Sequence, residues 1–156
     1  MSTPAERLAA LGINLPTPTA PVANYVPFIR LDSGLIHISG QVAVNTETGM
    51  RHLGIVGEDL DVPQAQAAAR QCAINLISQM NVACGGDLGR IRQVVKLNGF
   101  VQAGPSFFDI PQVVNGASDL MVEVFGDLGR HARSAVGVYR LPMNFAVEVD
   151  CVVWAA

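Results

Sequence analysis

The sequence predicts an α+β fold in which two long helices pack on one face of a mostly antiparallel sheet. Two long stretches show helical spacing of apolar residues, and five stretches have the composition or alternation of strands. These segments follow the order (α)ββαβαββ, without an internal repeat of fixed period. A chain of 156 residues fits one domain. We therefore expect a single domain over residues 1–156, with a short helical extension over about residues 1–20.

The N-terminal part of the chain contains a helix signal and then two strand signals. A Ser-Thr-Pro start predicts a short helix over residues 3–11, and the proline-rich stretch 14–24 is expected to be extended and irregular. Tyr25–Leu31 and Leu35–Ser39 are predicted strands, joined by an Asp-Ser-Gly turn. We expect Gly40 to end the second strand.

The two long helices have clear start signals. Asp61 is a predicted N-cap, and Pro63 lies in the first turn of a helix over residues 62–83, whose apolar face is rich in small residues. Pro111 opens a second helix over residues 110–125, and glycines break it. Both helices are suited to lie against a sheet.

The remaining strand signals lie in the C-terminal part of the chain. Ile91–Val101 is one predicted strand, and Ser134–Leu141 and Phe145–Trp154 are two more, joined by a Pro-Met-Asn turn. We expect these last two strands to pair as a hairpin. If that hairpin is tight, Glu148 pairs with a residue near Gly137.

Composition argues for a partner subunit and against nucleic acid. Half of the residues are hydrophobic and only 15% are charged, which suggests more apolar surface than one small monomer needs. The net charge is −3, Lys96 is the single lysine, and the arginines are scattered. Because no basic stripe is present to neutralise phosphates, nucleic acid is an unlikely ligand.

The cysteines, histidines and apolar runs exclude other classes of site. The three cysteines are widely spaced without a CxxC motif, which favours buried thiols in a cytoplasmic protein (Cys72, Cys84, Cys151). The three histidines lack ligand spacing, so no metal is expected (His37, His52, His131). We expect no signal peptide, because the N-terminus lacks the apolar core of one, and no membrane span, because no apolar run reaches about 18 residues.

Two charges stand out on the apolar C-terminal strands. An arginine such as Arg133 offers a planar fork that fits a ligand carboxylate. A partly buried glutamate such as Glu148 can hold or activate a water, because burial raises its pKa. Alternatively, both are surface charges whose interaction is worth at most about 1 kcal/mol. The residues by themselves leave both interpretations open.

Several motifs together resemble the RidA/YjgF/YER057c/UK114 family, which is also called endoribonuclease L-PSP-like. They are YVPF, HISGQ, VNGASDLMVEVFG, ARSAVGVYRLP and AVEVD, and the resemblance spans about residues 25–153. It implies a chorismate-mutase-like α+β fold, with a mixed sheet and two long helices on one face. It also implies a homotrimer with clefts between its subunits.

The resemblance further implies an activity and its residues. The archetype is a hydrolase, an enamine/imine deaminase that converts reactive intermediates such as 2-aminoacrylate to 2-keto acids and ammonia, without a cofactor. Arg133 matches the arginine that grips the substrate carboxylate, and Glu148 matches the glutamate that positions the attacking water. The implied substrate-binding positions are Tyr25, Ser39, Gly40, Asn115 and Ala135.

Departures from the family pattern keep one other function open, and an activity attributed to some relatives keeps a second one open. Ala135 stands where many members have a cysteine that helps to hold the water, and His131-Ala132 replaces the usual Pro-Ala. One alternative is therefore a trimer that binds small carboxylates without turnover. The other is an endoribonuclease, which the acidic pI and the near-absence of lysine argue against.

Overall fold

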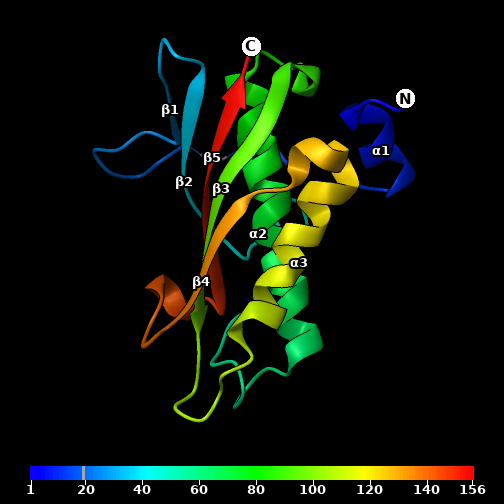
Figure 1. Cartoon of the computed structure of the whole chain (residues 1–156). Coiled ribbons are helices and arrows are strands. Elements are labelled where there is room, and N and C mark those ends of the chain that lie inside the picture. Colours follow the sequence, from blue (N-terminus) through cyan, green and yellow to red (C-terminus); the bar gives the residue numbers. More distant parts are fainter. Residues whose placement is uncertain (19) are drawn as a thin grey trace.

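A five-stranded sheet is covered on one face by two long helices in the computed structural model, which describes residues 1–18 and 20–156 (Figure 1). The helices are α1 (Pro4–Ala10), α2 (Val62–Ala83) and α3 (Ile110–Phe125). The strands are β1 (Phe28–Arg30), β2 (Leu35–Val42), β3 (Ile91–Gln102), β4 (Ala132–Val138) and β5 (Val147–Ala155). The predicted α+β class, with both long helices on one face, is confirmed. We call the other side the uncovered face.

The sheet has the order β1-β2-β5-β3-β4, so the predicted hairpin between the last two strands is wrong. β5 lies between β2 and β3 and is antiparallel to both, whereas β4 pairs with β3 in parallel at the edge. Glu148 therefore pairs with Val42 and Phe100, not with a residue near Gly137. The reason for the error is physical: the alternation of buried apolar residues along β5 fixes which face meets the helices, but not which strands lie beside it.

Two further strand predictions need correction. β2 does not stop at Gly40 but continues to Val42, with a register shift between Ile38 and Gln41. A bulge lets the strand bend without ending its ladder. The first strand starts only at Phe28, so Tyr25 lies in the loop that precedes it.

The two long helices begin and end where the sequence predicts, and they pack closely on each other. Asp61 caps α2 through the backbone N–H of Gln64, whose side chain in turn accepts from the backbone N–H of Asp61. At the contact between the helices, a Cβ on Gly116 of α3 would overlap the carbonyl oxygen of Gln66. The glycine permits this close approach, which sets the position of α3 over β3 and β4.

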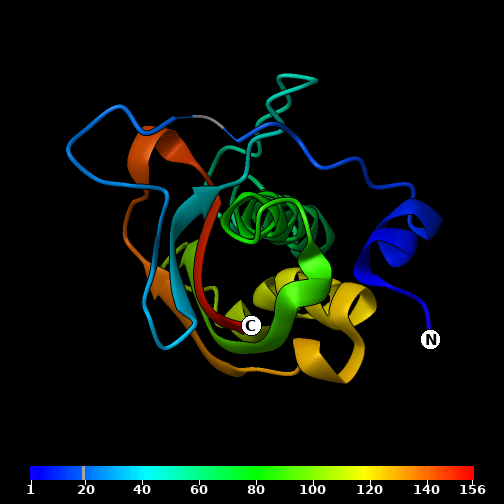
Figure 2. The same ribbon diagram turned by 90° about the horizontal axis from the view of Figure 1, so that it is seen from above.

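The N-terminal segment runs across the helix layer from α1 to β1 (Figure 2). Leu8 of α1 is buried in the core, and the side chain of Ser78 on α2 donates a hydrogen bond to the carbonyl oxygen of Pro16. The segment is therefore tied to the second helix. The three cysteines are buried free thiols, as predicted. Within the described residues, no helix has both the length and the apolar character needed to cross a bilayer.

Candidate functional site

Arg133 and Glu148 lie on opposite faces of the sheet. Arg133 pairs with Leu97, a fully buried residue that faces the helices, and the guanidinium contacts α3. Glu148 pairs with Phe100, three residues further along β3. Because side chains alternate along a strand, positions 97 and 100 face opposite ways. Glu148 thus projects from the uncovered face.

Glu148 is a partly buried carboxylate next to a glycine. A Cβ on Gly40 of the neighbouring strand would overlap Oε1 of Glu148, so only a glycine leaves room for the carboxylate in this position. Burial raises the pKa of Glu148, and the negative charge of Asp150 raises it further. A carboxylate with a raised pKa is a better proton acceptor once it is ionised.

Asp150 is two residues beyond Glu148 on β5 and therefore shares its face. Its Oδ1 accepts a hydrogen bond of 2.6 Å from Nδ2 of Asn98 on β3. The amide holds the aspartate beside the glutamate, so the uncovered face carries two neighbouring carboxylates. The negative charge of Asp150 therefore favours the protonated form of Glu148.

The predicted binding residues Tyr25, Ser39 and Gly40 lie together beside Glu148. Ser39 donates a hydrogen bond of 2.7 Å to the carbonyl oxygen of Val26, which fixes the loop that carries Tyr25. All three residues line a cavity of about 380 Å³ between the N-terminal segment, β2 and α2. They also line a hollow of about 600 Å³ on the uncovered face, with Asp150. Both volumes are on the scale of a small-molecule site.

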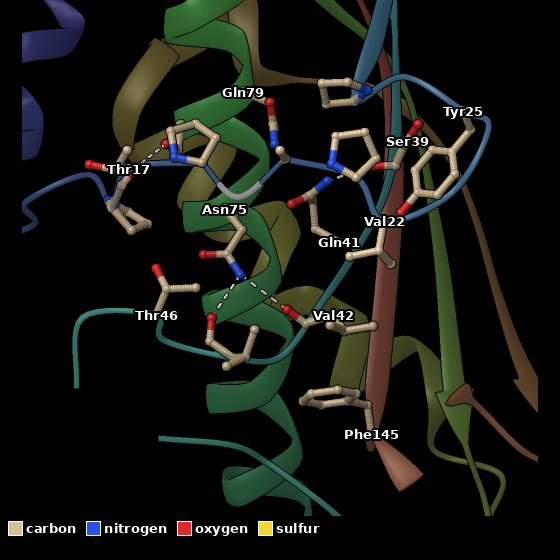
Figure 3. A pocket seen from close by; sticks show the side chains of 18 of the residues that line it. Thr17, Val22, Tyr25, Ser39, Gln41, Val42, Thr46, Asn75, Gln79 and Phe145 are labelled. Carbon is tan, nitrogen blue, oxygen red and sulfur yellow. Dashed lines mark hydrogen bonds between the residues drawn. The ribbon is translucent and has the colours of Figure 1, made fainter. Parts of the chain in front are cut away.

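Figure 3 shows how the first of these cavities is lined. Tyr25 and Val22 lie on its β2 side, and amide side chains approach from α2. Asn75 donates to the carbonyl oxygens of Val42 and Val44, at 3.1 and 2.9 Å. These bonds hold the end of β2 against the helix and so support the strand that carries Ser39 and Gly40.

Arg133 is held by side chains from α3. Its Nη1 donates to Oδ1 of Asn115 at 2.7 Å and to Oγ of Ser118 at 3.2 Å. Asn115 and Ser118 are one helical turn apart and face the same way. Within residues 1–18 and 20–156, no carboxylate lies within ion-pair distance of Arg133. The guanidinium is therefore fixed by neutral groups and keeps its charge for a ligand.

Ala135 lies two residues beyond Arg133 on β4 and faces the same side. It pairs with Gly99 and packs against the hydrophobic core. Its methyl group cannot form a hydrogen bond to a water, whereas the cysteine expected at this position from the family motif could. No group of three His, Cys, Asp or Glu side chains in the described part of the chain is arranged to bind a metal ion.

The structure thus divides the predicted site residues into two groups. Asn115, Arg133 and Ala135 lie on the helix side of the sheet at its β4 edge. The other four lie together around the Gly40 position of β2 (Tyr25, Ser39, Gly40, Glu148). Ser118 and Asp150 were missed. Both had a signal in the sequence, since Ser118 is three residues from Asn115 on a predicted helix and Asp150 is two residues from Glu148 on a predicted strand.

Comparison with known proteins identifies relatives along nearly the whole chain. The model of the YjgF/chorismate-mutase-like endoribonuclease family matches residues 5–154. Protein TCP17 of Trypanosoma cruzi is 50% identical over 151 residues, which are 96% of this chain and 92% of TCP17. The 2-iminobutanoate/2-iminopropanoate deaminase of Dermatophagoides farinae is 27% identical over 141 residues, or 90% of this chain and 93% of the deaminase.

The crystal structure of the protein Atu1372 from Agrobacterium tumefaciens is similar over most of its length. It superposes with a TM-score of 0.90 at 44% identity, covering 98% of this chain and 92% of that chain. At that similarity, the two proteins share the same overall fold.

Proposed function

The chain belongs to the RidA/YjgF family, and from this premise we propose that it is an enamine/imine deaminase. It would hydrolyse small reactive 2-imino and 2-enamino acids to 2-keto acids and ammonia. The observation that carries the proposal is Glu148, a partly buried carboxylate with a raised pKa, whose carboxylate lies against Gly40, a residue that lines a cavity of small-molecule size. The relative named 2-iminobutanoate/2-iminopropanoate deaminase supports the same activity.

The chemistry needs little more than orientation and one base. A protonated imine carbon is already electrophilic, so the enzyme has to place a water and accept one of its protons. In the proposal, Glu148 accepts that proton while the water oxygen bonds to the imine carbon. Protonated Glu148 then returns the proton to the nitrogen of the aminoalcohol. The C–N bond breaks as the hydroxyl oxygen forms the carbonyl of the keto acid, and the hydroxyl proton leaves with ammonia as ammonium. Arg133 binds the substrate carboxylate through two parallel hydrogen bonds.

We place this site between copies of the chain in a homotrimer. One chain cannot bring Arg133 and Glu148 to one small substrate, because the sheet separates them. A second copy can present the β4 edge with Arg133 to the uncovered face with Glu148. That face carries exposed apolar side chains on three strands, which a partner would bury (Ile29, Val136, Trp154).

The experiment is hydrolysis of 2-iminopropionate generated in the assay, followed by keto-acid formation. Glu148→Gln and Arg133→Ala are expected to lower kcat/KM by about 100-fold or more. The exposed Glu47→Gln and Arg92→Ala are the matched controls and should retain wild-type activity. Full activity in either of the two site variants would exclude the residue from the reaction.

A non-catalytic carboxylate-binding protein is the second candidate, and Ala135 favours it. With no side-chain hydrogen bond from this position, a water beside Glu148 has one ligand fewer than in a cysteine-bearing relative. Binding of 2-ketobutyrate that depends on Arg133, without ammonia release from any imine, would select this candidate. Cleavage of RNA that disappears in Glu148→Gln would instead support an endoribonuclease, although the net charge of −3 gives RNA little attraction.

A further inference from the structure

We propose that Ser118 and His131 are positioning residues for Arg133, joined to it by a hydrogen-bond relay with a fixed direction. The proposal rests on the proposed function, in which Arg133 binds the substrate carboxylate. It concerns two residues that neither the family resemblance nor the sequence pattern assigned to the site. The relay connects α3 to the start of β4 at the point where the guanidinium leaves the sheet.

The direction of the relay follows from its first bond. His131 Nδ1 lies 2.6 Å from the carbonyl oxygen of Gly129. A carbonyl oxygen can only accept, so Nδ1 carries the hydrogen. In the neutral imidazole, Nε2 then has a lone pair and accepts from the hydroxyl of Ser118, at 3.0 Å. The single hydroxyl proton of Ser118 is thereby directed toward His131.

The second consequence concerns the guanidinium. Because the proton of Ser118 points to His131, its lone pairs are free to face Arg133, whose Nη1 lies 3.2 Å away. Nη1 has two hydrogens, and Asn115 and Ser118 accept one each. The edge formed by Nε and Nη2 then remains for a carboxylate, in the geometry of a bidentate pair. The relay therefore selects the rotamer of Arg133 and the edge that it offers.

The consequences of removing each member differ. In Ser118→Ala, Nη1 of Arg133 keeps Asn115 as an acceptor but loses its second acceptor. The guanidinium can then turn about the Cδ–Nε bond of the side chain. In His131→Phe, the ring shape stays but the hydroxyl of Ser118 loses its acceptor and is free to turn its proton toward the cation. Ser118→Thr retains the hydroxyl at the same position and should restore the relay. The exposed Asp119→Ala is the control on the same helix.

Binding of the unreactive acid 2-ketobutyrate to the full-length protein, measured by calorimetry, is the first readout. We expect Kd to rise about tenfold in Ser118→Ala and His131→Phe, since each loosens one charged hydrogen bond. Ser118→Thr and Asp119→Ala should stay within about twofold of wild type. In the imine assay, these two variants should show a similar rise in KM. Their kcat should be nearly unchanged, because the reacting groups are untouched. An unchanged Kd in Ser118→Ala would overturn the proposal.

The second readout tests the relay without any ligand. Nitrogen NMR of the His131 ring distinguishes a nitrogen that carries hydrogen from one that does not. We expect hydrogen on Nδ1 and a bare Nε2 in wild type at neutral pH. Hydrogen on Nε2 would contradict the relay even if Arg133 binds carboxylates. Conversely, if Arg133→Ala binds 2-ketobutyrate as well as wild type, the proposed function fails while the tautomer measurement still decides the relay.

Discussion

Arg133 and Glu148 project from opposite faces of one sheet. Arg133 is on β4 and Glu148 is on β5, and β3 lies between these two strands. Arg133 pairs with Leu97 and Glu148 pairs with Phe100, both on β3. α3 holds the arginine on the helix side, and Gly40 accommodates the glutamate on the other side. In the proposed function, each chain supplies both halves of a site, and two copies are brought together to complete one.

The raised pKa of Glu148 predicts that its ionised form destabilises the fold. The folded chain binds this proton more tightly than the unfolded chain does, so stability falls as the pH rises through the range above the ordinary glutamate value. Glu148→Gln removes the charge and keeps the shape. We expect the variant to have the larger free energy of unfolding at pH 7, measured with urea at equal protein concentration.

The same measurement below pH ~4.3, the ordinary glutamate pKa, is the internal control. There the wild-type carboxyl is protonated in both states, so the two proteins should be equally stable. If the free energy of unfolding of Glu148→Gln exceeds that of wild type by the same amount at acid pH, the glutamine stabilises the fold by another route. A variant less stable than wild type at pH 7 would contradict the cause given for the shift.

Asp150 is expected to set the acid limb of the activity profile. Its charge is the second cause of the raised pKa of Glu148. In Asp150→Asn, that charge is absent, so the pKa of Glu148 should fall and activity should persist to lower pH. The pH dependence of kcat/KM, which reports the free enzyme, checks this. An acid limb that stays in place would show that Asp150 does not act on Glu148 through its charge.

Gly40→Ala is expected to reduce activity much more than stability. The added Cβ would overlap only the end of the flexible Glu148 side chain, which can move away, and Gly40 does not have a positive φ. A displacement of about 1 Å can lower kcat/KM by about 100-fold, whereas the free energy of unfolding should change by less than about 1 kcal/mol.

Gly104→Ala is the matched control for that prediction. Its Cβ would lie 2.9 Å from Oε1 of Glu58, another flexible carboxylate, which lies outside the proposed site. It should leave activity near the wild-type level. If Gly40→Ala and Gly104→Ala behave alike in the imine assay, the position of the Glu148 carboxylate is not what limits the reaction.

Gly116→Ala tests the packing that places Asn115 and Ser118. Its Cβ would overlap the backbone oxygen of Gln66, which cannot move without shifting α2. We expect a loss of about 2–3 kcal/mol in the free energy of unfolding, as for overpacked cores. Asp119→Ala, on the exposed side of the same helix, should change it by less than about 0.5 kcal/mol. If Gly116→Ala is as stable as wild type, α2 and α3 have room to move apart.

The helices were the most predictable part of this fold, and strand pairing was the least. Residues 62–83 and 110–125 carry their own start and stop signals, so their limits follow from local chemistry. Alternation tells which residues of a strand share a face, but it does not tell which strand lies next to it. The C-terminal strands therefore suggested a hairpin, although β5 enters the middle of the sheet.

The same limit explains what was predictable about the site. Residue types and motifs pointed to Arg133 and Glu148, and alternation placed Ala135 on the side of Arg133. Their separation by the sheet depends on the pairing of both strands with β3, which no local pattern encodes. Ser118 was missed because its spacing of three residues from Asn115 on a predicted helix becomes informative only when the arginine that both residues contact is placed.

The most direct test of the account is complementation between two inactive variants. Arg133→Ala and Glu148→Gln are each expected to be inactive. They are mixed in equal amounts, unfolded and refolded together, and assayed for imine hydrolysis. If each site takes Glu148 from one copy and Arg133 from the next, about a quarter of the sites are intact in a random closed ring, and about a quarter of wild-type activity should return. If the mixture stays as inactive as its components while wild type recovers fully after the same treatment, the site does not lie between copies.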